Sequence, residues 1–228
     1  MRRTLESIAH QGRFEVVIVD DGTDVETRVV CELGARPARR LIRSSNWLTY
    51  LKLERPNTAF RNPAYPNNVG ITHSKGDIIL LQNAEFYHVD TNTVAKLTNA
   101  VSDNNAVFAR VTSLLPDGTK GDLYCGKENP RPYFFCGAIK RAWFEKLRGF
   151  DEDYTGAGFD DDDFADRLRA SGVSFEFSDV EVHHQWHPPV LGMADFAPMQ
   201  ALYNKKKADM EAGSIGVVRN LGKDWGRL

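Results

Sequence analysis

The 228-residue sequence lacks the features that mark several large classes of protein. Its three cysteines, Cys31, Cys125 and Cys136, lie far apart with no CxxC pair, so we expect neither a disulfide framework nor a closed zinc site. No apolar run approaches the roughly 20 residues that span a bilayer. The first residues are amphipathic and unlike the apolar segment of a signal peptide. We therefore expect a cytoplasmic protein without a transmembrane segment.

An excess of positive charge is also missing. The formal net charge of -2 argues against general binding to nucleic acid or to an anionic membrane, since both favour a basic surface. Hydrophobic residues make up 42% of the chain, which is enough for a sizeable core. The length fits one α/β domain better than two small ones, so we expect a single domain over residues 1–228, either alone or in an oligomer.

Strand and helix patterns alternate along the chain. Compact apolar runs predict buried strands at 14–19, 77–82 and 106–112, with weaker strands at 41–43, 175–177 and 180–184. Helical spacing predicts helices at 2–11, 24–33, 66–75, 91–102, 141–147, 160–171 and 195–210. The polar stretch 117–132, with Gly and Pro, predicts a mobile loop. This alternation predicts an α/β fold with a mostly parallel central sheet and helices on both faces.

Polar residues follow two of the predicted strands. Asp20 and Asp21 end the first, and Asn83 and Glu85 follow the second. In open α/β sheets, ligands bind beyond the carboxyl ends of the strands. A carboxylate there can accept hydrogen bonds from a base or ribose, or hold a hard cation that bridges phosphate oxygens. The ordinary alternative is that Asp-Gly-Thr forms a turn and Asp24 caps a helix.

Four consecutive aspartates occupy positions 160–163, after a glycine-containing stretch at 156–159. An acidic first helical turn, with an Asp163–Arg167 pair one turn apart, explains one or two of them. It does not explain four, because adjacent like charges repel. A carboxylate here could instead act as a general base towards an attacking hydroxyl.

A histidine cluster follows the last predicted strand. His183 and His184 face opposite sides of a strand, so at most one of them joins His187 at a common site. Imidazole is a frequent metal ligand, whereas a lone histidine is more often packed or exposed, which we expect for His183. Metal binding and ordinary packing both remain open for the other two, and the spacing is not specific for zinc.

In chain order, these clusters resemble the large inverting glycosyltransferase family commonly called family 2, of the Rossmann-like GT-A fold. TLESIAHQ and FEVVIVDDGT are similar to the family's first helix, second strand and nucleotide-binding Asp-Asp-Gly-Ser. The stretch 61–70 and HSKGDIILLQNAE resemble the approach to the Asp-x-Asp motif. CGAIKRAWFEKLRGFDEDYTGAGFDDDDFADRLRASG resembles the acceptor-side motif. A later histidine that completes the metal shell is typical of galactosyltransferase-like members. The resemblance covers nearly the whole chain.

The resemblance implies a nucleotide-sugar-binding half over 1–115 and an acceptor half over 116–228. Residues implied on the nucleotide side are Asp20 and Asp21, with Arg61 and Asn68 as weaker candidates and Asn83 near the ribose or the metal.

The resemblance also implies a metal and a base. Glu85 would hold Mn²⁺ or Mg²⁺, with His187, or else His184, completing the metal shell. Asp161 would serve as the base and Asp160 would bind acceptor hydroxyls. The implied reaction moves a sugar, with inversion, from a nucleotide-diphosphate donor, UDP-linked, to a hydroxyl of a glycan, lipid-linked or protein acceptor. Trp143 and Trp186 could stack on a sugar, although core packing is expected for Trp143.

Two departures from the family leave alternatives open. The family normally opens with a strand of the Ile-Pro-Thr-Tyr-Asn type, whereas this sequence begins at the following helix, and Asn83 replaces the first acid of Asp-x-Asp. Both departures favour a non-catalytic relative that binds a nucleotide sugar or glycan. A nucleotidyltransferase would carry a Gly-rich signature with Arg or Lys near the N-terminus, and the sequence has none.

Overall fold

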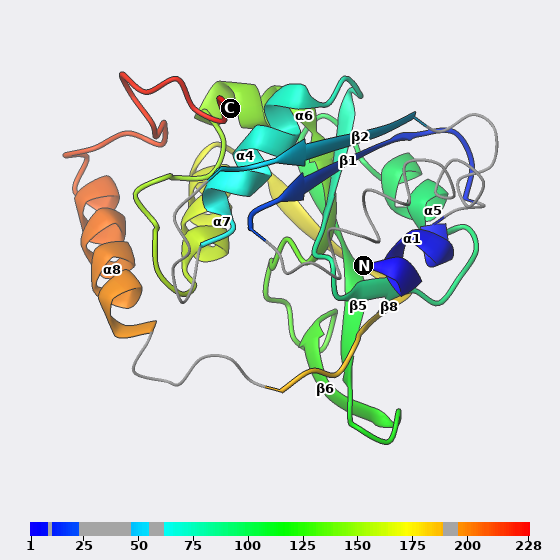
Figure 1. Cartoon of the computed structure of the whole chain (residues 1–228). Coiled ribbons are helices and arrows are strands. Elements are labelled where there is room, and N and C mark those ends of the chain that lie inside the picture. The colour runs from blue at the N-terminus through cyan, green and yellow to red at the C-terminus, as the bar shows by residue number, and fades with distance from the viewer. Residues whose placement is uncertain (9–10, 23–46, 55–61, 189–195) are drawn as a thin grey trace.

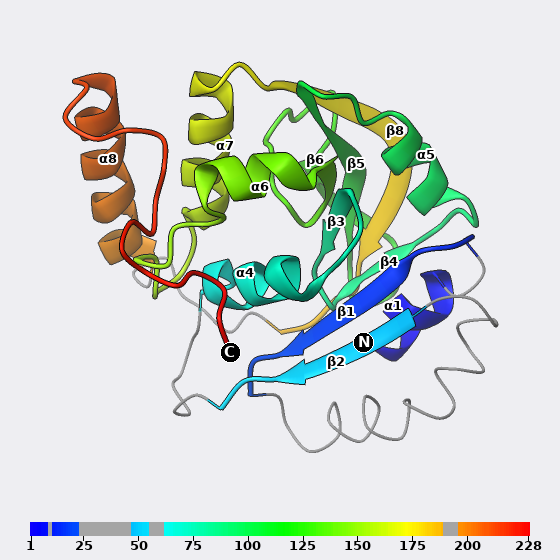
Figure 2. The same ribbon diagram turned by 90° about the horizontal axis from the view of Figure 1, so that it is seen from above.

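The computed structural model describes residues 1–8, 11–22, 47–54, 62–188 and 196–228, and its strands form two sheets (Figures 1 and 2). The smaller sheet contains β1 (Glu15–Asp20) and β2 (Trp47–Lys52), which run parallel. The larger sheet has the order β3-β7-β5-β8-β4, with β6 also paired to β5. Its strands are β3 (Ile78–Gln82), β4 (Phe86–His88), β5 (Asn105–Leu114), β6 (Lys120–Cys125), β7 (Cys136–Lys140) and β8 (Ser174–His184).

Strand direction in the larger sheet differs from the prediction. Only β5 and β8 pair in parallel there, and the other described pairs are antiparallel. The expectation of a mostly parallel central sheet is therefore wrong, and the sheet is mixed. The physical reason is β7, which comes after β3 and β5 in the chain but inserts between them and runs against both.

The described helices all overlap predicted ranges. They are α1 (Arg2–Ile8), α4 (Ala64–His73), α5 (Thr93–Asn99), α6 (Arg141–Leu147), α7 (Asp160–Ala170) and α8 (Ala197–Glu211). The helix predicted for 24–33 and the strand predicted for 41–43 lie outside the described residues. Among the described helices, none combines the length and apolar character needed to cross a membrane.

The strands were predicted less completely. The strands expected at 14–19, 77–82 and 106–112 are confirmed as β1, β3 and β5, and the two short strands expected near 175–184 are parts of the single strand β8. The loop prediction for 117–132 is wrong over 120–125, because these residues form β6 against β5 in a projecting hairpin (Figure 1). Strands β2, β4 and β7 were not predicted.

Two apolar clusters of unequal size hold the sheets. The larger surrounds β5 and packs its buried side chains against α5, α6 and α7, with Phe108, Leu97, Phe144 and Phe164 fully buried. The smaller consists of buried Leu5 and Ile18, with partly buried neighbours, and joins α1 to β1. The larger core thus fixes the second half of the chain, where the acidic turn and the histidines lie.

Candidate active site

A cleft of about 600 Å³ lies between β1 and β3 and is also lined by residues of α1 and α4. Both strands start at the same edge, because the Glu15 carboxylate accepts hydrogen bonds from the backbone N–H groups of Lys75 and Gly76, just before β3. Their carboxyl ends therefore meet at the opposite edge. There the cleft is lined by Asp21 and Glu85, together with Asn83.

The two aspartates after β1 have different surroundings. Asp20 is buried, and its carboxylate accepts hydrogen bonds from the backbone N–H of Gly22 (3.1 Å) and the hydroxyl of Tyr50. Asp20 thus holds the turn, whereas Asp21 lines the cleft. Of these two aspartates, both expected on the nucleotide side, Asp21 is the one that lines the cleft.

Backbone hydrogen bonds join the β3–β4 turn to the end of β8. The backbone N–H of Gln185 and its side-chain amide both donate to the carbonyl oxygen of Glu85, each at 3.0 Å. The backbone N–H of Asn83 donates to the carbonyl of Phe135 at 3.1 Å. The bonds between Gln185 and Glu85 join residues that are 100 positions apart in the sequence.

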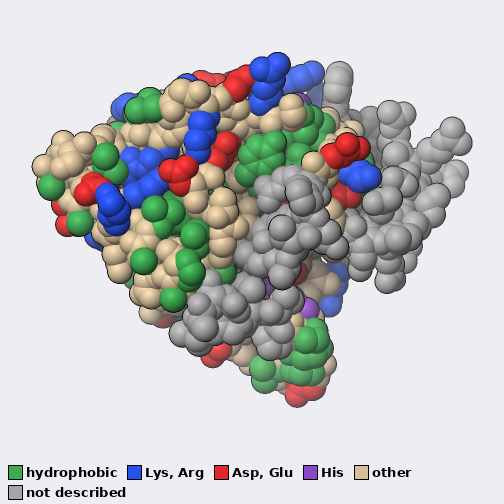
Figure 3. All heavy atoms as spheres, turned by 60° about the vertical axis from the view of Figure 1, so that its left-hand side comes forward, with side chains coloured by type: hydrophobic (Ala, Val, Ile, Leu, Met, Phe, Trp, Pro, Cys, Tyr) green, Lys and Arg blue, Asp and Glu red, His purple; other side chains and the backbone are tan. Residues whose placement is uncertain are grey.

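Glu85, His184 and His187 form the one cluster of potential metal ligands found among the described residues, with their ligand atoms all within 4.8 Å of one another. The Nε2 atoms of the two histidines are 3.2 Å apart. Partial burial lowers the pKa of His184 and the neighbouring His187 acts in the same direction, while Glu85 opposes it. Neutral imidazole is the form that binds a cation. Histidine side chains reach the surface above the projecting hairpin (Figure 3).

The geometry of this cluster fits a divalent cation. Two ligand atoms about 2.1 Å from one ion, at an angle of about 90° to 110°, lie about 3.0 to 3.4 Å apart, which matches the separation of the two Nε2 atoms. Nδ1 of His187 lies 3.0 Å from the carbonyl oxygen of Pro188, so an N–H there leaves Nε2 unprotonated. One carboxylate and two imidazoles suit Mn²⁺ better than Mg²⁺, which prefers oxygen ligands.

His183 faces away from this cluster, as expected for adjacent strand residues. Its ring contacts the Tyr87 hydroxyl (3.1 Å) and the Glu181 carboxylate (3.2 Å). Trp143 is a core residue, as expected, and its Nε1 donates to the carbonyl of Asp103 at 2.7 Å. Trp186 is 49% exposed beside His187, so a ligand could reach its ring.

The acidic turn begins α7 after two residues with positive φ, Gly158 (77°) and Phe159 (67°). Asp160 is buried, and the Asn62 amide donates to its Oδ1 at 3.1 Å. Its Oδ2 has no hydrogen-bond partner among the described residues. Burial raises the pKa of Asp160 to about 6, and the hydrogen bond from Asn62 opposes that rise.

Asp161 and Asp162 are partly buried on the same turn. Burial raises the pKa of Asp161 well above its usual range, and the charges of Asp160 and Asp162 add to the effect, although the backbone N–H of Phe134 donates to its carboxylate. Asp162 lies 4.0 Å from the Arg131 guanidinium. A carboxyl group with a raised pKa accepts a proton more readily than an exposed aspartate, which suits a general base.

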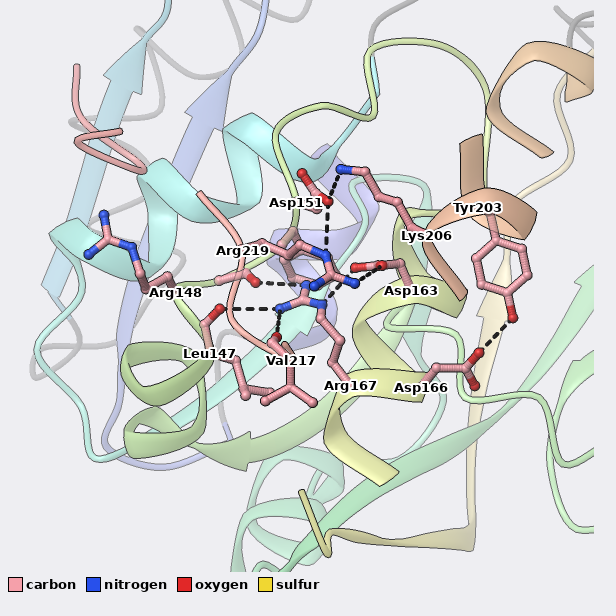
Figure 4. Close-up of polar contacts among 12 residues, drawn as sticks. Leu147, Arg148, Asp151, Asp163, Asp166, Arg167, Tyr203, Lys206, Val217 and Arg219 are labelled. Atoms are coloured by element: carbon pink, nitrogen blue, oxygen red, sulfur yellow. Dashed lines mark hydrogen bonds and ion pairs between the residues drawn. The ribbon is translucent and has the colours of Figure 1, made fainter. Parts of the chain in front are cut away.

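Asp163 has a structural role in a buried ion network (Figure 4). Its carboxylate pairs with Arg167 at 2.7 Å, which confirms the predicted pair, and with Arg219 at 3.3 Å. Arg167 is fully buried and also donates to the carbonyl oxygens of Leu147, Gly149 and Val217. Arg219 and Lys206 both pair with Asp151. The network ties α7 to α6, α8 and the segment after α8.

An aromatic group connects the acidic turn to the histidine cluster. The Phe86 ring packs on His184 (centroids 4.8 Å apart) and on Phe135 (5.3 Å), and Phe135 stacks on Tyr133 (4.8 Å). Burial raises the pKa of the Tyr133 phenol, and the charges of Asp162 and Asp161 act in the same direction. Asp161 and His184 therefore border the same aromatic group, although Asp161 is not among the lining residues of the cleft.

Asn68, one of the two weaker nucleotide-side candidates, is not among the residues that line the cleft. Asn68 is fully buried, and its side chain bonds to both backbone groups of Phe150 and to the Glu152 carboxylate. The expectation of a nucleotide contact for Asn68 is therefore wrong, because its amide holds the segment after α6. Arg61 lies outside the described residues.

Sequence reasoning missed Asn62 and the aromatic group. Asn62 donates to Asp160 and borders a second cavity of about 360 Å³, which is also lined by Tyr65, Glu152, Tyr154, Thr155 and Lys223. Asn62 directly precedes α4, and no spacing relates it to the acidic turn. The run Tyr133-Phe134-Phe135 was visible in the sequence, but its neighbours suggested a loop.

Comparison with protein-family models gives one match, over residues 125–189, to the model described as the N-terminal domain of galactosyltransferase. The matched segment is less than a third of the chain, but it contains the whole acidic turn and both histidines of the cluster. Glu85 and the cleft-lining strands lie outside it. No curated protein matches the chain in sequence.

Two solved structures are similar to the chain at low identity. The catalytic domain of Drosophila β1,4-galactosyltransferase 7 in complex with xylobiose is 18% identical with a TM-score of 0.46, and the alignment covers 72% of this chain and 64% of that one. A mutant of the Drosophila enzyme in complex with manganese, UDP-Gal and xylobiose is 17% identical with a TM-score of 0.46, over 81% of this chain and 69% of that one. At this level of likeness, neither structure assigns an activity. Over residues 125–189 the chain is similar to galactosyltransferases, and nothing singles out family 2.

Proposed function

We propose that this chain is a metal-dependent glycosyltransferase that moves a sugar from a UDP-linked donor to a hydroxyl group of a glycan acceptor. The observation that carries the proposal is that Glu85, which lines the cleft together with Asp21, also lies in one cluster with His184 and His187. These ligands come from two separate strand ends, which the pairing of β4 with β8 brings together. A divalent cation bound there would offset the charge that develops on the leaving diphosphate.

The donor would lie at the carboxyl edge of β1 and β3. Asp21 would accept hydrogen bonds from the base or ribose, and Asn83, at the same end of the cleft, would donate or accept one. Glu85 would hold the cation together with the two histidines. Since Asn83 replaces a carboxylate, the histidines carry more of the binding than in an Asp-x-Asp site.

Asp161 would be the base. In a single displacement, the acceptor hydroxyl gives its proton to the Asp161 carboxylate and its oxygen bonds to the anomeric carbon. The bond from that carbon to the diphosphate oxygen breaks on the opposite face, so the configuration inverts. Oδ2 of Asp160, which has no hydrogen-bond partner among the described residues, would orient an acceptor hydroxyl.

The family-model match supports this assignment independently of the geometry, because it covers the acidic turn and the histidines together. The Drosophila neighbour was solved with manganese, UDP-Gal and xylobiose, and these are the first compounds to test. The neutral Asn83 keeps one competing proposal open, namely a relative that binds the donor without turnover.

A thermal-shift experiment tests the donor site. UDP and Mn²⁺ together should raise the melting temperature by more than the sum of their separate shifts, because the ion bridges protein and diphosphate. Glu85→Ala should lower the affinity for Mn²⁺, obtained by following the melting temperature across a Mn²⁺ titration, by about 10- to 100-fold. Glu211→Ala, which removes an exposed carboxylate at the end of α8, is the matched control and should behave as wild type.

Equal Mn²⁺ titrations for wild type and Glu85→Ala would refute the metal site. Release of UDP from UDP-Gal in the presence of xylobiose then tests turnover. A metal-dependent UDP shift without turnover on any donor or acceptor would favour the binding relative over the transferase.

A further inference from the structure

The second cavity, of about 360 Å³, lies on the far side of α4 from the cleft between β1 and β3. Pro66, Asn67 and Gly70 of α4 line the cleft, whereas Tyr65 lines the second cavity. In a helix with 3.6 residues per turn, position 65 faces away from positions 66, 67 and 70. The segment after α8 runs beside α4 and contributes Lys223 to the cavity (Figure 2). A ligand in this cavity would therefore lie apart from the proposed donor site.

Asn62 separates the second cavity from the acidic turn. Its side-chain amide donates to the carbonyl oxygens of Gly156 (2.7 Å) and Gly158 (3.4 Å) and to Oδ1 of Asp160 (3.1 Å). Its own carbonyl oxygen accepts a hydrogen bond from the backbone N–H of Ala64 at 2.9 Å. Both polar ends of the Asn62 side chain are thus engaged by the protein, and none of the four aspartates of the turn lines the cavity. The cavity is therefore distinct from the place where an acceptor would meet the proposed base.

The two charged side chains of the cavity are already opposed by protein groups. One carboxylate oxygen of Glu152 accepts hydrogen bonds from the Asn68 amide and from the backbone N–H of Gly226, each at 2.9 Å. The Lys223 ammonium pairs with Asp153 at 2.6 Å, and this contact raises the pKa of Lys223, so the ammonium stays charged at neutral pH. A charged ligand would find no unopposed charge here to offset the loss of its hydration, which favours a neutral ligand.

Several hydrogen-bonding groups of the cavity are still available to a ligand. The second carboxylate oxygen of Glu152 accepts no hydrogen bond from the described residues, and Lys223 uses one of its three donors. The Thr155 hydroxyl has no partner in the described part of the chain. Tyr154 is 2% exposed, and its hydroxyl is buried without a hydrogen-bond partner from those residues. A buried hydroxyl in this state is costly, so a ligand that supplies the partner would gain affinity.

We propose that the second cavity binds one neutral sugar ring. Each sugar hydroxyl can both donate and accept, which matches a wall that combines the Glu152 acceptor, the Lys223 donors and the hydroxyls of Tyr154 and Thr155. The rings of Tyr65 and Tyr154 supply an apolar surface for the C–H face of the sugar. The volume lies at the lower end of the range for small-molecule sites, so it fits a single ring. The site uses neither the cation nor the cleft and is independent of the proposed function.

Saturation-transfer NMR on the full chain tests the proposal with four free sugars, namely galactose, glucose, xylose and N-acetylglucosamine. At least one of them should bind with a dissociation constant between about 0.1 and 20 mM. Binding should persist when UDP and Mn²⁺ are added, because α4 lies between the two sites. Acetate and glycine, as anionic and zwitterionic probes, should not displace the sugar.

Three variants locate the bound sugar. Thr155→Leu places a larger apolar side chain at an exposed position of the cavity and should weaken binding by at least about 10-fold. Thr155→Ala, which removes the hydroxyl without adding bulk, replaces it if the leucine variant does not fold. Tyr154→Phe removes the buried hydroxyl alone and should weaken binding by about 3- to 10-fold. The control Tyr203→Phe removes a hydroxyl that donates to Asp166 outside the cavity, and it should bind as wild type.

Each outcome decides the proposal. A sugar whose binding follows this pattern supports it. Failure of all four sugars to bind at about 20 mM would overturn it. Unchanged binding in the Thr155 variant would place the sugar elsewhere, displacement by UDP with Mn²⁺ would place it in the cleft, and displacement by acetate or glycine would make the cavity a site for ions. The Mn²⁺ titration of Glu85→Ala decides the proposed function separately.

Discussion

The two sheets of this molecule differ in how firmly they are held. The six-stranded sheet lies inside the large apolar core, with β5 fully buried along much of its length. The β1–β2 sheet rests on the small cluster of Leu5 and Ile18. In the proposed enzyme, the base and the histidines belong to the part of the molecule built on the six-stranded sheet, which we call the firm body. Asp21 belongs to the part built on the β1–β2 sheet. The difference suggests that the reacting groups are fixed while the donor side can adjust.

Asp161→Asn should give the largest effect and would sharpen this comparison. Removing the base should lower turnover by about 10²- to 10⁴-fold. The UDP and Mn²⁺ shift should stay as in wild type, because Asp161 is not among the residues assigned to the metal or to the donor. Asp162→Asn, which changes the next carboxylate, is the control and should retain turnover within a few-fold. Unchanged turnover in Asp161→Asn would remove its role as base.

Arg167→Leu should break the firm body itself. The substitution removes the ion pair between Arg167 and Asp163, so that Arg219 is the one ion-pair partner left to Asp163 among the described residues. It also removes the hydrogen bonds that Arg167 donates to three carbonyl oxygens. Truncating a buried ion pair in this way costs about 3–5 kcal/mol, to be measured by urea unfolding. Arg169→Leu, on the exposed side of the same helix, should cost less than about 1 kcal/mol. Similar losses for both would contradict the assigned role of the network.

Asp160→Asn should give a smaller effect of opposite sign. Because burial raises the folded-state pKa of Asp160 to about 6, above the usual value of 3.8, its ionisation costs stability as pH rises between these values. The neutral asparagine should therefore stabilise the protein at pH 8 by about 3 kcal/mol and have little effect at pH 4.

Asp153→Asn provides the contrast. Hydrogen bonds from Lys206 and Lys223 lower the pKa of Asp153 from the usual 3.8 to about 2. The ionised carboxylate therefore stabilises the folded protein at any pH above 3.8. This stabilisation is lost as the pH falls from 3.8 towards 2. Its asparagine variant should lose stability at pH 8. Urea midpoints across pH for both variants test the two signs, and parallel curves would contradict them.

Sequence patterns predicted the helices and the central strands because these depend on local periodicity. The prediction of parallel strands in the larger sheet was wrong because the strand Cys136–Lys140 was not predicted. Its five residues form only a short apolar run, and no local pattern indicates that they pair with β3, some sixty residues earlier in the chain. The strand β6 was missed because its residues are polar and half exposed, and only pairing with β5 makes them a strand.

The candidate site was predictable where residues follow strand ends. Glu85 and His184 were singled out in this way, and the structure brings them together with His187, whereas Asp161 was singled out by its place in a run of four aspartates. Which histidine joins Glu85 was left open, and both do. Asn68 was misassigned because a resemblance in sequence does not show which way a helical side chain points. The division into donor and acceptor halves stays a prediction.

The ion network has a consequence for how the protein is made. Arg219 holds Asp151 and Asp163, and the Asn220 side chain donates to the carbonyls of Arg148 and Phe150. The acidic turn is thus completed by residues translated some sixty positions after it. During synthesis on the ribosome, Asp151 and Asp163 would emerge before their partner Arg219. A chain that ended before residue 219 would still contain every described strand and the histidine cluster. Its acidic turn would lack these ion pairs, and with them part of what holds the start of α7 in position.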